Sequence, residues 1–477
     1  MSAMNYDRIA RLYGDPAQIS NFASAFHHLQ LSSGSSLFFK ATLNMLSLYK
    51  WRKIVVTLVH CHRSTHHVQP STTDQVSAKE SKLAPASPTQ ATIQTISSHR
   101  AWPMRIAGAM FFLAGTAVFV YTIVAVDSTS SLCAKYTRCG VASYQWNAGE
   151  THCTCLMFVD RQTVPRSFSE WEEPEDATAR LAELAVAGEL RIVQIINRAL
   201  PEIPVELRRC RNLERIILIY TKTQHFPDWI REFSHLEYIH LEGDLTPRRL
   251  QALPDGMFDH LPHLTFLHLG VIVDVPKIPS LTKLHRLQYL VLVGLESMAA
   301  LPSFEGLSEL HTLLIADATH IPVLPSLAPL ANIRTIALRF RNAVCCNGFL
   351  TGACDLAAFA CHPRAGEPNV RCTSERISAS DRAVLDDINA FYCPTDGSDD
   401  VDLAMIAPTR ATTDDLCGGV LYKQCALGNM TGMCYNSRMQ VVNCVVLPEY
   451  ETMRRLQIAR GVGEPCNPVI ESWLGCS

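Results

Sequence analysis

The chain has 477 residues, a formal net charge of −3 at pH 7 and 18 cysteines. Its length excludes one simple domain and suggests about three. No nucleic-acid partner, cofactor or metal is expected.

Residues 1–105 are predicted to form a cytoplasmic arm. Within it, residues 36–59 are apolar with interspersed Lys and Arg, which predicts a basic amphipathic helix on the inner leaflet; a second membrane span is the alternative. Residues 63–99 are rich in Ser, Thr, Pro, Gln and His, and this composition predicts a disordered tether. The histidines around Cys61 match no closed zinc site, so a solvated polar run is expected there.

Residues 106–126 are predicted to cross a membrane as one helix. This segment of 21 residues carries no charge, and roughly 20 residues span a bilayer core. It begins too far from Met1 for a cleaved signal peptide, so a retained signal anchor is expected. Eleven Lys and Arg against four Asp and Glu precede it, which favours a cytoplasmic arm because basic residues stay inside.

The cysteines favour the same orientation. Cys61 alone precedes the segment, and seventeen cysteines follow it. Such a density is typical of disulfides in an oxidising compartment. The glycosylation sequon Asn429-Met430-Thr431 lies on the same side. The prediction is a single-pass type II protein of the plasma membrane, with its C-terminal ectodomain outside the cell.

A leucine pattern with a period of 23 residues occupies residues 190–343. Each copy reads Leu-x-x-Leu-x-Leu or a close variant, and the copies begin at Leu213, Leu236, Leu264, Leu287, Leu310 and Ile333, after a weaker copy at Leu190. In leucine-rich repeats each copy supplies one short strand to a parallel, curved stack, so we expect an α/β solenoid of six or seven repeats. The step from Leu236 to Leu264 is longer than the others, which predicts an insertion around residues 255–259.

The turns of the repeats carry two further signals. A late proline in each copy predicts an extended turn opposite the strand; these are Pro204, Pro227, Pro254, Pro279, Pro302 and Pro325. The asparagine that many such repeats place after the strand is missing, and Thr221, Asp244, Ile272, Leu295, Ala318 and Arg341 stand there. Because an asparagine ladder would satisfy backbone groups, irregular turns are expected without it.

Cysteine-containing modules flank the repeats. Residues 127–189 are expected to form an N-terminal cap, whose four cysteines, Cys133, Cys139, Cys153 and Cys155, allow three pairings. Residues 344–477 are expected to form a disulfide-rich module that partly caps the repeats. Its disulfide candidates are Cys345, Cys346, Cys354, Cys361, Cys372, Cys393, Cys417, Cys425, Cys434, Cys444, Cys466 and Cys476. The adjacent Cys345 and Cys346 are expected to pair with different partners, and the odd Cys210 to be a small buried apolar residue.

Three features together resemble a known family: one early span, short leucine-rich repeats, and a cysteine-rich tail that ends Trp473-Leu474-Gly475-Cys476. They are similar to the oomycete leucine-rich-repeat membrane proteins with a C-terminal WLGC domain. The segment from Cys345 to Phe349 also looks like that family's entry into the cysteine-rich region. The resemblance covers roughly residues 100–477, and it implies an architecture and a membrane address but no chemistry.

The side chains between the inward leucines face the concave surface, because strand side chains alternate. One column contains Tyr238, Phe266 and Tyr289 in succession, and the next contains His240 and His268. Aromatic residues dominate binding hot spots, so these five are the predicted ligand-binding residues. A face this apolar indicates either an external ligand or an internal cover made by the N-terminal cap or the tail. The two histidines could sense pH, but as a metal site they lack an evident third ligand.

The leading hypothesis is a membrane-anchored extracellular protein that binds a protein or glycan partner. The alternative is a structural or adhesive role, as a tether between membrane and wall or a self-assembling surface protein. No catalytic activity is expected, because the tail lacks a Gly-x-Ser-x-Gly elbow, a His-Glu-x-x-His helix and a phosphate loop. Acidic pairs such as Asp386-Asp387, Asp399-Asp400 and Asp414-Asp415 are expected to be solvated turn residues. The ligand, the disulfide connectivity and the oligomeric state are not fixed by the sequence.

Overall fold

The computed structural model describes residues 42–43, 45–47, 49–55, 91–144, 152–246, 248–362, 369–393 and 407–477. These residues fall into two compact units. One unit contains residues 136–143 and those from 152 onwards, and the other contains those from 42 to 135 together with Tyr144.

The smaller unit contains the helix α4 (Ala91–Cys133), which includes the predicted span. Its segment Gly108–Cys133 has 26 residues and a mean hydropathy of 2.2, so it is long and apolar enough to cross a bilayer. The helix begins at Ala91, ahead of the predicted span. The described positions between 42 and 55 are also helical. The flanks of the predicted amphipathic helix, the histidines after position 59 and residues 63–90 lie outside the described residues.

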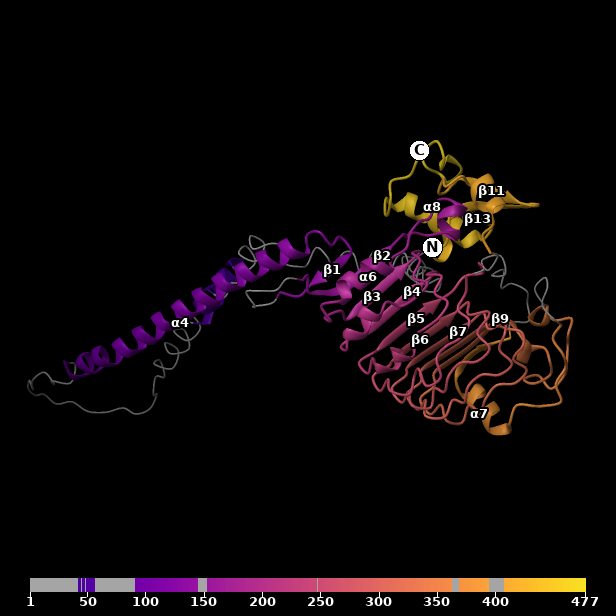
Figure 1. The fold of residues 1–477 in the computed structure, drawn as a ribbon, viewed down its shortest axis with the longest axis horizontal. Helices are drawn as coiled ribbons and strands as arrows, with labels where there is room; N and C mark the ends of the chain where they lie inside the picture. The colour runs from indigo at the N-terminus through magenta and orange to yellow at the C-terminus, as the bar shows by residue number, and fades with distance from the viewer. Residues whose placement is uncertain are drawn as a thin grey trace, which may run out of the picture. The chain divides into compact units, whose positions relative to one another are not determined.

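A ten-stranded sheet in chain order forms the larger unit (Figure 1). Its strands are β1 (Cys139–Ala142), β2 (Cys155–Arg161), β3 (Ile192–Ile196), β4 (Arg215–Ile219), β5 (Tyr238–Glu242), β6 (Phe266–Gly270), β7 (Tyr289–Val293), β8 (Thr312–Ala318), β9 (Thr335–Asn342) and β10 (Asn389–Tyr392). All neighbours pair in parallel except β1, which is antiparallel to β2. The sheet therefore extends beyond residues 190–343, because both cysteine-containing modules add strands to it.

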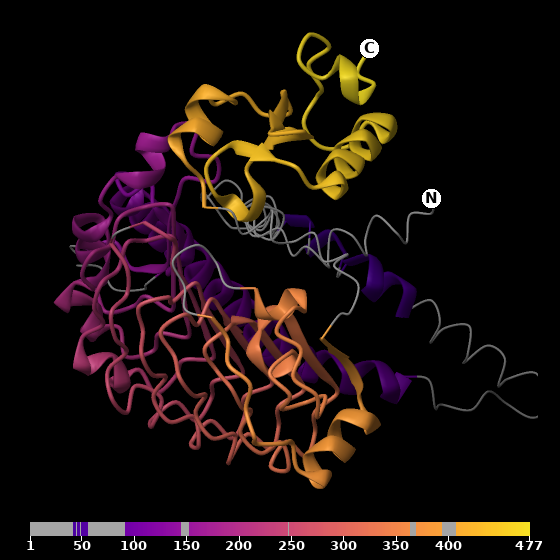
Figure 2. The ribbon, with the colours of Figure 1, turned by 90° about the vertical axis from the view of Figure 1, so that its right-hand side faces the viewer.

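The strands line the inner side of the curved stack, and the turns form its outer side (Figure 2). The core lies between these two layers: the first leucine of each copy is fully buried, at Leu213, Leu236, Leu264, Leu287 and Leu310. Within β5, Ile239 and Leu241 are buried while Tyr238 and His240 are partly exposed. The period-2 alternation thus separates the core from the inner face, as the leucine pattern predicts. On the outer side, short helices begin directly after two of the late prolines, as η1 (Val205–Arg209) and η2 (Asp228–Glu232).

Most turns after the strands share one backbone geometry, whereas the turn after β5 departs from it at Gly243 and the ladder between β8 and β9 is irregular after Ala316. The turn residue takes a left-handed conformation at Asn197, Tyr220, Val271, Gly294, Asp317 and Phe340. The backbone N–H at four of these residues donates to the carbonyl of a residue in the next strand of the stack, for example from Tyr220 to Glu242 (2.8 Å) and from Gly294 to Ala316 (3.0 Å). These backbone hydrogen bonds satisfy N–H and C=O groups in the turns, a role that an asparagine ladder has in many such repeats.

The extra residues between β5 and β6 lie earlier in the sequence than predicted. Ile219 is in register with Glu242, and His225 is bridged to Ala252. The stretch after β5 is therefore four residues longer than the matching stretch after β4. Most of the insertion lies before Ala252, not around residues 255–259, and it forms the loop that contains Asp244 and Thr246.

The N-terminal cap contains β1, β2 and two helices, α5 (Phe168–Glu172) and α6 (Thr178–Ala185). A disulfide joins Cys139 to Cys155, and Cys133 and Cys153 are also disulfide-bonded. Cys210 is a free buried thiol, as predicted. Its burial raises its pKa to about 11.

The cysteine-rich region consists of two modules. The first follows β9 and contains η3 (Ala343–Cys345), η4 (Phe359–Cys361), α7 (Ala379–Asp387) and β10. Its disulfides are Cys345–Cys393, Cys346–Cys361 and Cys354–Cys372, so the adjacent cysteines do take different partners.

The second module, which we call the C-terminal domain, comprises residues 407–477. It contains a π-helical turn η6 (Ala411–Asp415), a three-stranded antiparallel sheet of β11 (Gln424–Leu427), β12 (Met430–Tyr435) and β13 (Asn443–Val445), and the helices η7 (Ser437–Met439), α8 (Pro448–Arg460) and η8 (Ser472–Leu474). Its disulfides are Cys417–Cys434, Cys425–Cys444 and Cys466–Cys476.

Candidate functional site

The predicted aromatic column exists on the inner face of the solenoid. In-register pairing places Tyr238, Phe266 and Tyr289 side by side on β5, β6 and β7. The rings of Tyr238 and Phe266 stack with centroids 4.2 Å apart and planes 3° from parallel, and the ring of Tyr289 lies 6.2 Å from Phe266. Tyr289 remains 44% exposed. The column is a preordered aromatic surface of the kind that protein interfaces use as anchors.

The predicted histidine pair lies next to this column. His240 and His268 stack with centroids 4.1 Å apart. The Nε2 atom of His240 lies 3.2 Å from Glu242 Oε2, and that of His268 lies 3.9 Å from the same oxygen. Burial and the nearby His240 lower the pKa of His268 to about 3, so its imidazole is neutral. The structure therefore brings all five predicted residues together and adds Glu242.

Glu242 is buried at the end of β5 and pairs with Arg438 of the C-terminal domain. The Tyr220 hydroxyl lies 3.2 Å from Glu242 Oε1 and 3.2 Å from the carbonyl oxygen of Arg438. Burial alone would raise the pKa of Glu242, but the positive charge of Arg438 and the hydrogen bond from His240 hold it well below its usual range. Glu242 is therefore a carboxylate, and it connects the inner face to the C-terminal domain.

The C-terminal domain contacts the carboxyl ends of the first repeat strands through the segment around Met439. Met439 and Val441 pack against Trp171, Ile196 and Ile219 in one buried cluster. The Asn197 side-chain amide donates to the Met439 carbonyl (2.6 Å). The C-terminal domain thus returns to the beginning of the repeats, whereas the first cysteine-rich module adds β10 beside the last repeat strand.

The same domain also binds the N-terminal cap. The Asp414 carboxylate accepts the backbone N–H of Phe168 (2.9 Å), and Arg166 donates to the Gly419 carbonyl (2.8 Å). Asp414 is therefore a contact residue, and the expectation of a solvated acidic pair is wrong for it. Asp386 and Asp387 are exposed at the end of α7, and the third acidic pair lies outside the described residues.

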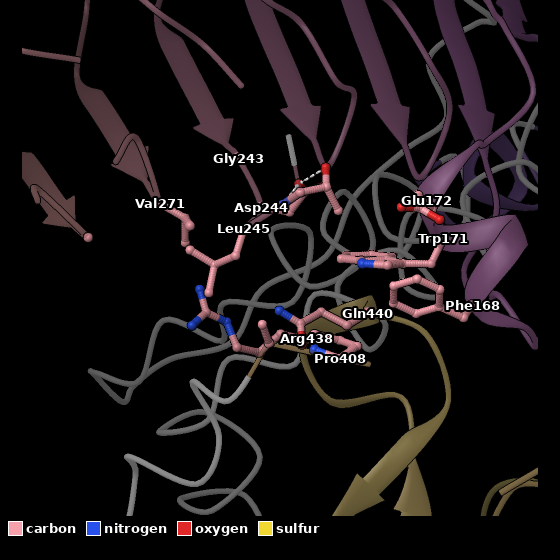
Figure 3. A pocket seen from close by; sticks show the side chains of 13 residues that line it. Phe168, Trp171, Glu172, Gly243, Asp244, Leu245, Val271, Pro408, Arg438 and Gln440 are labelled. Carbon is pink, nitrogen blue, oxygen red and sulfur yellow. Dashed lines mark hydrogen bonds between the residues drawn. The ribbon is translucent and has the colours of Figure 1, made fainter. Parts of the chain in front are cut away.

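A cavity of about 160 Å³ lies at this junction. Figure 3 shows Trp171 and Phe168 of α5 on one side and Leu245 and Val271 on the other, with Arg438 between them. Nearby, Lys222 forms a buried ion pair with Asp244, and its Nζ lies 5.1 Å from the centroid of the Trp171 ring.

The last residues of the chain each have a distinct physical role. The indole N–H of Trp473 donates to the Tyr422 carbonyl (3.0 Å), and Leu474 is buried in the core of the domain. Gly475 has φ 92°, a left-handed conformation that suits glycine. Cys476 closes the disulfide with Cys466. These four residues therefore stabilise the domain by a hydrogen bond, by packing, by a backbone turn and by a disulfide.

The C-terminal domain offers no thiolate metal site among the residues described. Cys417, Cys425 and Cys434 have sulfur atoms within 4.8 Å of one another, but all three are disulfide-bonded. Inside the domain, Arg454 and Glu471 form a buried ion pair (2.7 Å). The Arg454 guanidinium also lies 4.1 Å from the Tyr422 ring centroid. This arrangement organises the core of the domain.

Sequence reasoning missed the junction residues Glu242, Arg438, Tyr220 and Trp171. One signal was available: the strand position of Glu242 is filled by Ile196, Ile219, Gly270, Val293 and Ala316 in β3 to β8, and charged residues stand there only at the ends of the array, as Arg161 and Arg339. A buried acid in an apolar column requires a partner. Nothing in the sequence indicated that the partner is Arg438, which lies in a distant segment.

Two comparisons with known proteins found similarities to parts of the chain. The WLGC domain family matches residues 412–477, which are the C-terminal domain described above. A solved leucine-rich-repeat protein from Leptospira interrogans is similar at 19% identity and a TM-score of 0.27, over 36% of this chain and 42% of the other. No curated protein sequence matches the chain. The chain thus combines a solenoid of the leucine-rich-repeat type with a region, residues 412–477, that matches the WLGC domain family.

Proposed function

We propose that this chain binds a protein or glycan partner through the inner face of its solenoid, with Tyr238, Phe266 and Tyr289 as the central contact. The observation that carries the proposal is the aromatic column: two rings stacked at 4.2 Å, beside a third residue that stays 44% exposed. Preordered aromatic side chains lose little conformational entropy on binding, and they contribute strongly to interfaces.

The surface next to the aromatic column also favours binding of a partner over exposure to solvent. Val291 and Leu314, beside the column, are apolar and partly exposed. A contiguous apolar patch of this kind marks an interaction surface. The hydrogen bonds and the ion pair that the C-terminal domain makes with the repeats fall at Asn197, Tyr220 and Glu242, at the carboxyl ends of the strands. Glu242 lies four residues beyond Tyr238, which is about 13 Å along the strand, so docking of that domain and binding at the column use different ends of the strands.

The proposed location of this surface is outside the cytoplasm, on a single-pass type II protein of the plasma membrane. An apolar helix long enough to span a bilayer precedes the repeats, and the disulfides suit an oxidising compartment. Asn429 of the sequon is exposed in the turn between β11 and β12, where a glycan would meet no steric obstacle from the adjoining strands.

The test replaces Tyr238, Phe266 and Tyr289 together with Ser in the full chain and measures partner capture at the surface of intact cells. We expect at least a tenfold loss, because hot-spot aromatics each contribute about 2 kcal/mol or more. The matched control replaces Val205, Met430 and Val469, which are exposed apolar residues outside the column, with Ser. Unchanged capture by the folded column variant would contradict the proposal, and crosslinked species made only of this chain would favour the self-assembling role.

A further inference from the structure

The inner face carries a cluster of possible metal ligands at the ends of β5 and β6. We propose that His240, His268 and Glu242 form a binding site for a divalent transition-metal ion, with Zn²⁺ as the best match. The ligand atoms of these three side chains all lie within 4.8 Å of one another. Glu242 is the third ligand that the sequence did not reveal.

The distances are close to those of a formed site. Zn²⁺ holds nitrogen and oxygen ligands at about 2.0–2.1 Å, so two ligands of a tetrahedral site lie about 3.3 Å apart. His240 Nε2 and Glu242 Oε2 are already 3.2 Å apart, whereas His268 Nε2 is 3.9 Å from that oxygen. The rings stack with planes 15° apart, so their lone pairs do not yet converge. Binding of both imidazoles to one ion therefore requires the His268 ring to rotate out of the stack.

The Nε2 atom of His268 gives independent support for a bound ion. It is buried, and within the described part of the chain it has no hydrogen-bond partner. Buried polar atoms in folded proteins are nearly always paired with protein, water or an ion. A metal ion coordinated by His268, His240 and Glu242 would satisfy this atom, and it would replace the hydrogen bond between His240 and Glu242 with coordination of both side chains.

The surroundings keep the ligands oriented and the space open. Arg438 and the Tyr220 hydroxyl engage Glu242 Oε1, which leaves Oε2 directed at the two histidines. Such outer contacts orient metal ligands in known sites. A Cβ atom at Gly270 would lie 2.8 Å from His268 Nε2 and 3.2 Å from Glu242 Cγ, so a glycine at this register leaves room for the ring to move.

The ligand chemistry favours a borderline ion over Mg²⁺ or Ca²⁺. Two imidazole nitrogens and one carboxylate oxygen suit zinc and neighbouring transition metals, whereas the hard cations prefer oxygen ligands alone. Because Arg438 already neutralises the charge of Glu242, the site attracts only weakly those cations that bind by charge alone. With three protein ligands, a fourth position would remain for water.

The experiment measures Zn²⁺ uptake by the purified full chain after removal of metal with a chelator, by equilibrium dialysis and elemental analysis. No partner is required, so the result is independent of the proposed function. We expect wild-type protein to bind one ion that the His268→Gln variant binds at least about tenfold more weakly. The same loss is expected for His240→Gln. The Glu242→Gln variant is less informative, because it also breaks the ion pair with Arg438 and so changes the docking of the C-terminal domain.

The chain offers a matched control in the same two repeats. His235 and His263 also stack, with centroids 6.3 Å apart, but both are exposed. Their joint change to Gln should leave this ion bound, and so should replacement of His60, His62, His66 and His67. X-ray absorption of the bound ion should show two imidazole ligands in wild type and one in His268→Gln. Equal uptake by wild type and His268→Gln, or loss of the ion in either control, would overturn the site.

Discussion

Arg438 of the C-terminal domain forms an ion pair with Glu242 of β5, a residue 196 positions earlier in the chain. Glu242 is 4% exposed and Arg438 is 24% exposed. The pair holds the end of a repeat strand to the WLGC domain, next to the histidines of the inner face. The solenoid and the C-terminal domain are therefore coupled at the carboxyl end of β5, beside the proposed metal site.

Removal of the guanidinium should loosen this docking. Arg438→Met leaves a buried carboxylate without its cation, and breaking a buried pair in this way costs about 3 kcal/mol. Hydrogen exchange of residues 436–442 measures the effect, and it should accelerate. The control is Arg211→Met, which breaks the exposed pair with Glu232 and should cost less than about 1 kcal/mol. Equal protection in the two variants would show that the pair does not hold the domain.

Gly475 provides a test of the terminal motif. Its φ is 92°, and a Cβ atom there would meet nothing within 4 Å. Gly475→Ala should therefore destabilise the C-terminal domain by about 1–2 kcal/mol through backbone strain alone. Gly475→Asn should cost less, because asparagine tolerates left-handed conformations better. Thermal unfolding compares the two variants, and equal melting temperatures for Ala, Asn and wild type would contradict the assigned role.

The Asp381 carboxylate should make stability depend on pH. It accepts the backbone N–H groups of Leu327 (2.7 Å) and Ala328 (3.1 Å) and the hydroxyls of Ser326 and Ser378. Burial opposes ionisation, but these hydrogen bonds together lower the pKa of Asp381 below its ordinary value of 3.8. The stabilisation is present above that value and is lost as pH falls through the lowered pKa.

The matching variant is Asp381→Asn. At pH 7 it should lower the free energy of unfolding by about 2 kcal/mol, because hydrogen bonds to a charged acceptor are lost. The difference from wild type should shrink below pH 3.8, when the wild-type carboxyl also becomes neutral. Denaturant unfolding at both pH values measures this, and a difference that grows on acidification would have the wrong sign.

Glycosylation of Asn429 tests the proposed orientation of the protein in the membrane. Its exposed turn should carry an N-linked glycan if the C-terminal domain enters the secretory lumen. Glycosidase treatment of the full chain should give one mobility shift, and Asn429→Gln should abolish it. Protein that lacks the shift, together with cysteines that react as free thiols, would place this domain on the cytoplasmic side.

The repeating parts of the molecule could be predicted from the sequence, because each depends on local spacing. The 23-residue period predicted the solenoid, and strand alternation brought Tyr238 and Phe266 together. The docking of the C-terminal domain could not be predicted. It depends on Arg438 meeting one acidic position among apolar ones, and no periodicity connects segments so distant. The third metal ligand was missed for the same reason, since Glu242 occupies a position that the repeat assigns to the core.

The most direct test of the central claim is site-specific photocrosslinking on intact cells. A photoreactive residue replaces Tyr289 in the aromatic column, and in a second variant it replaces Val205, which is 62% exposed on the outer turns. We predict a discrete crosslinked partner from position 289 and none from position 205. Crosslinks from position 289 that lead only to this same chain, or the same species from both positions, would contradict a binding surface on the inner face.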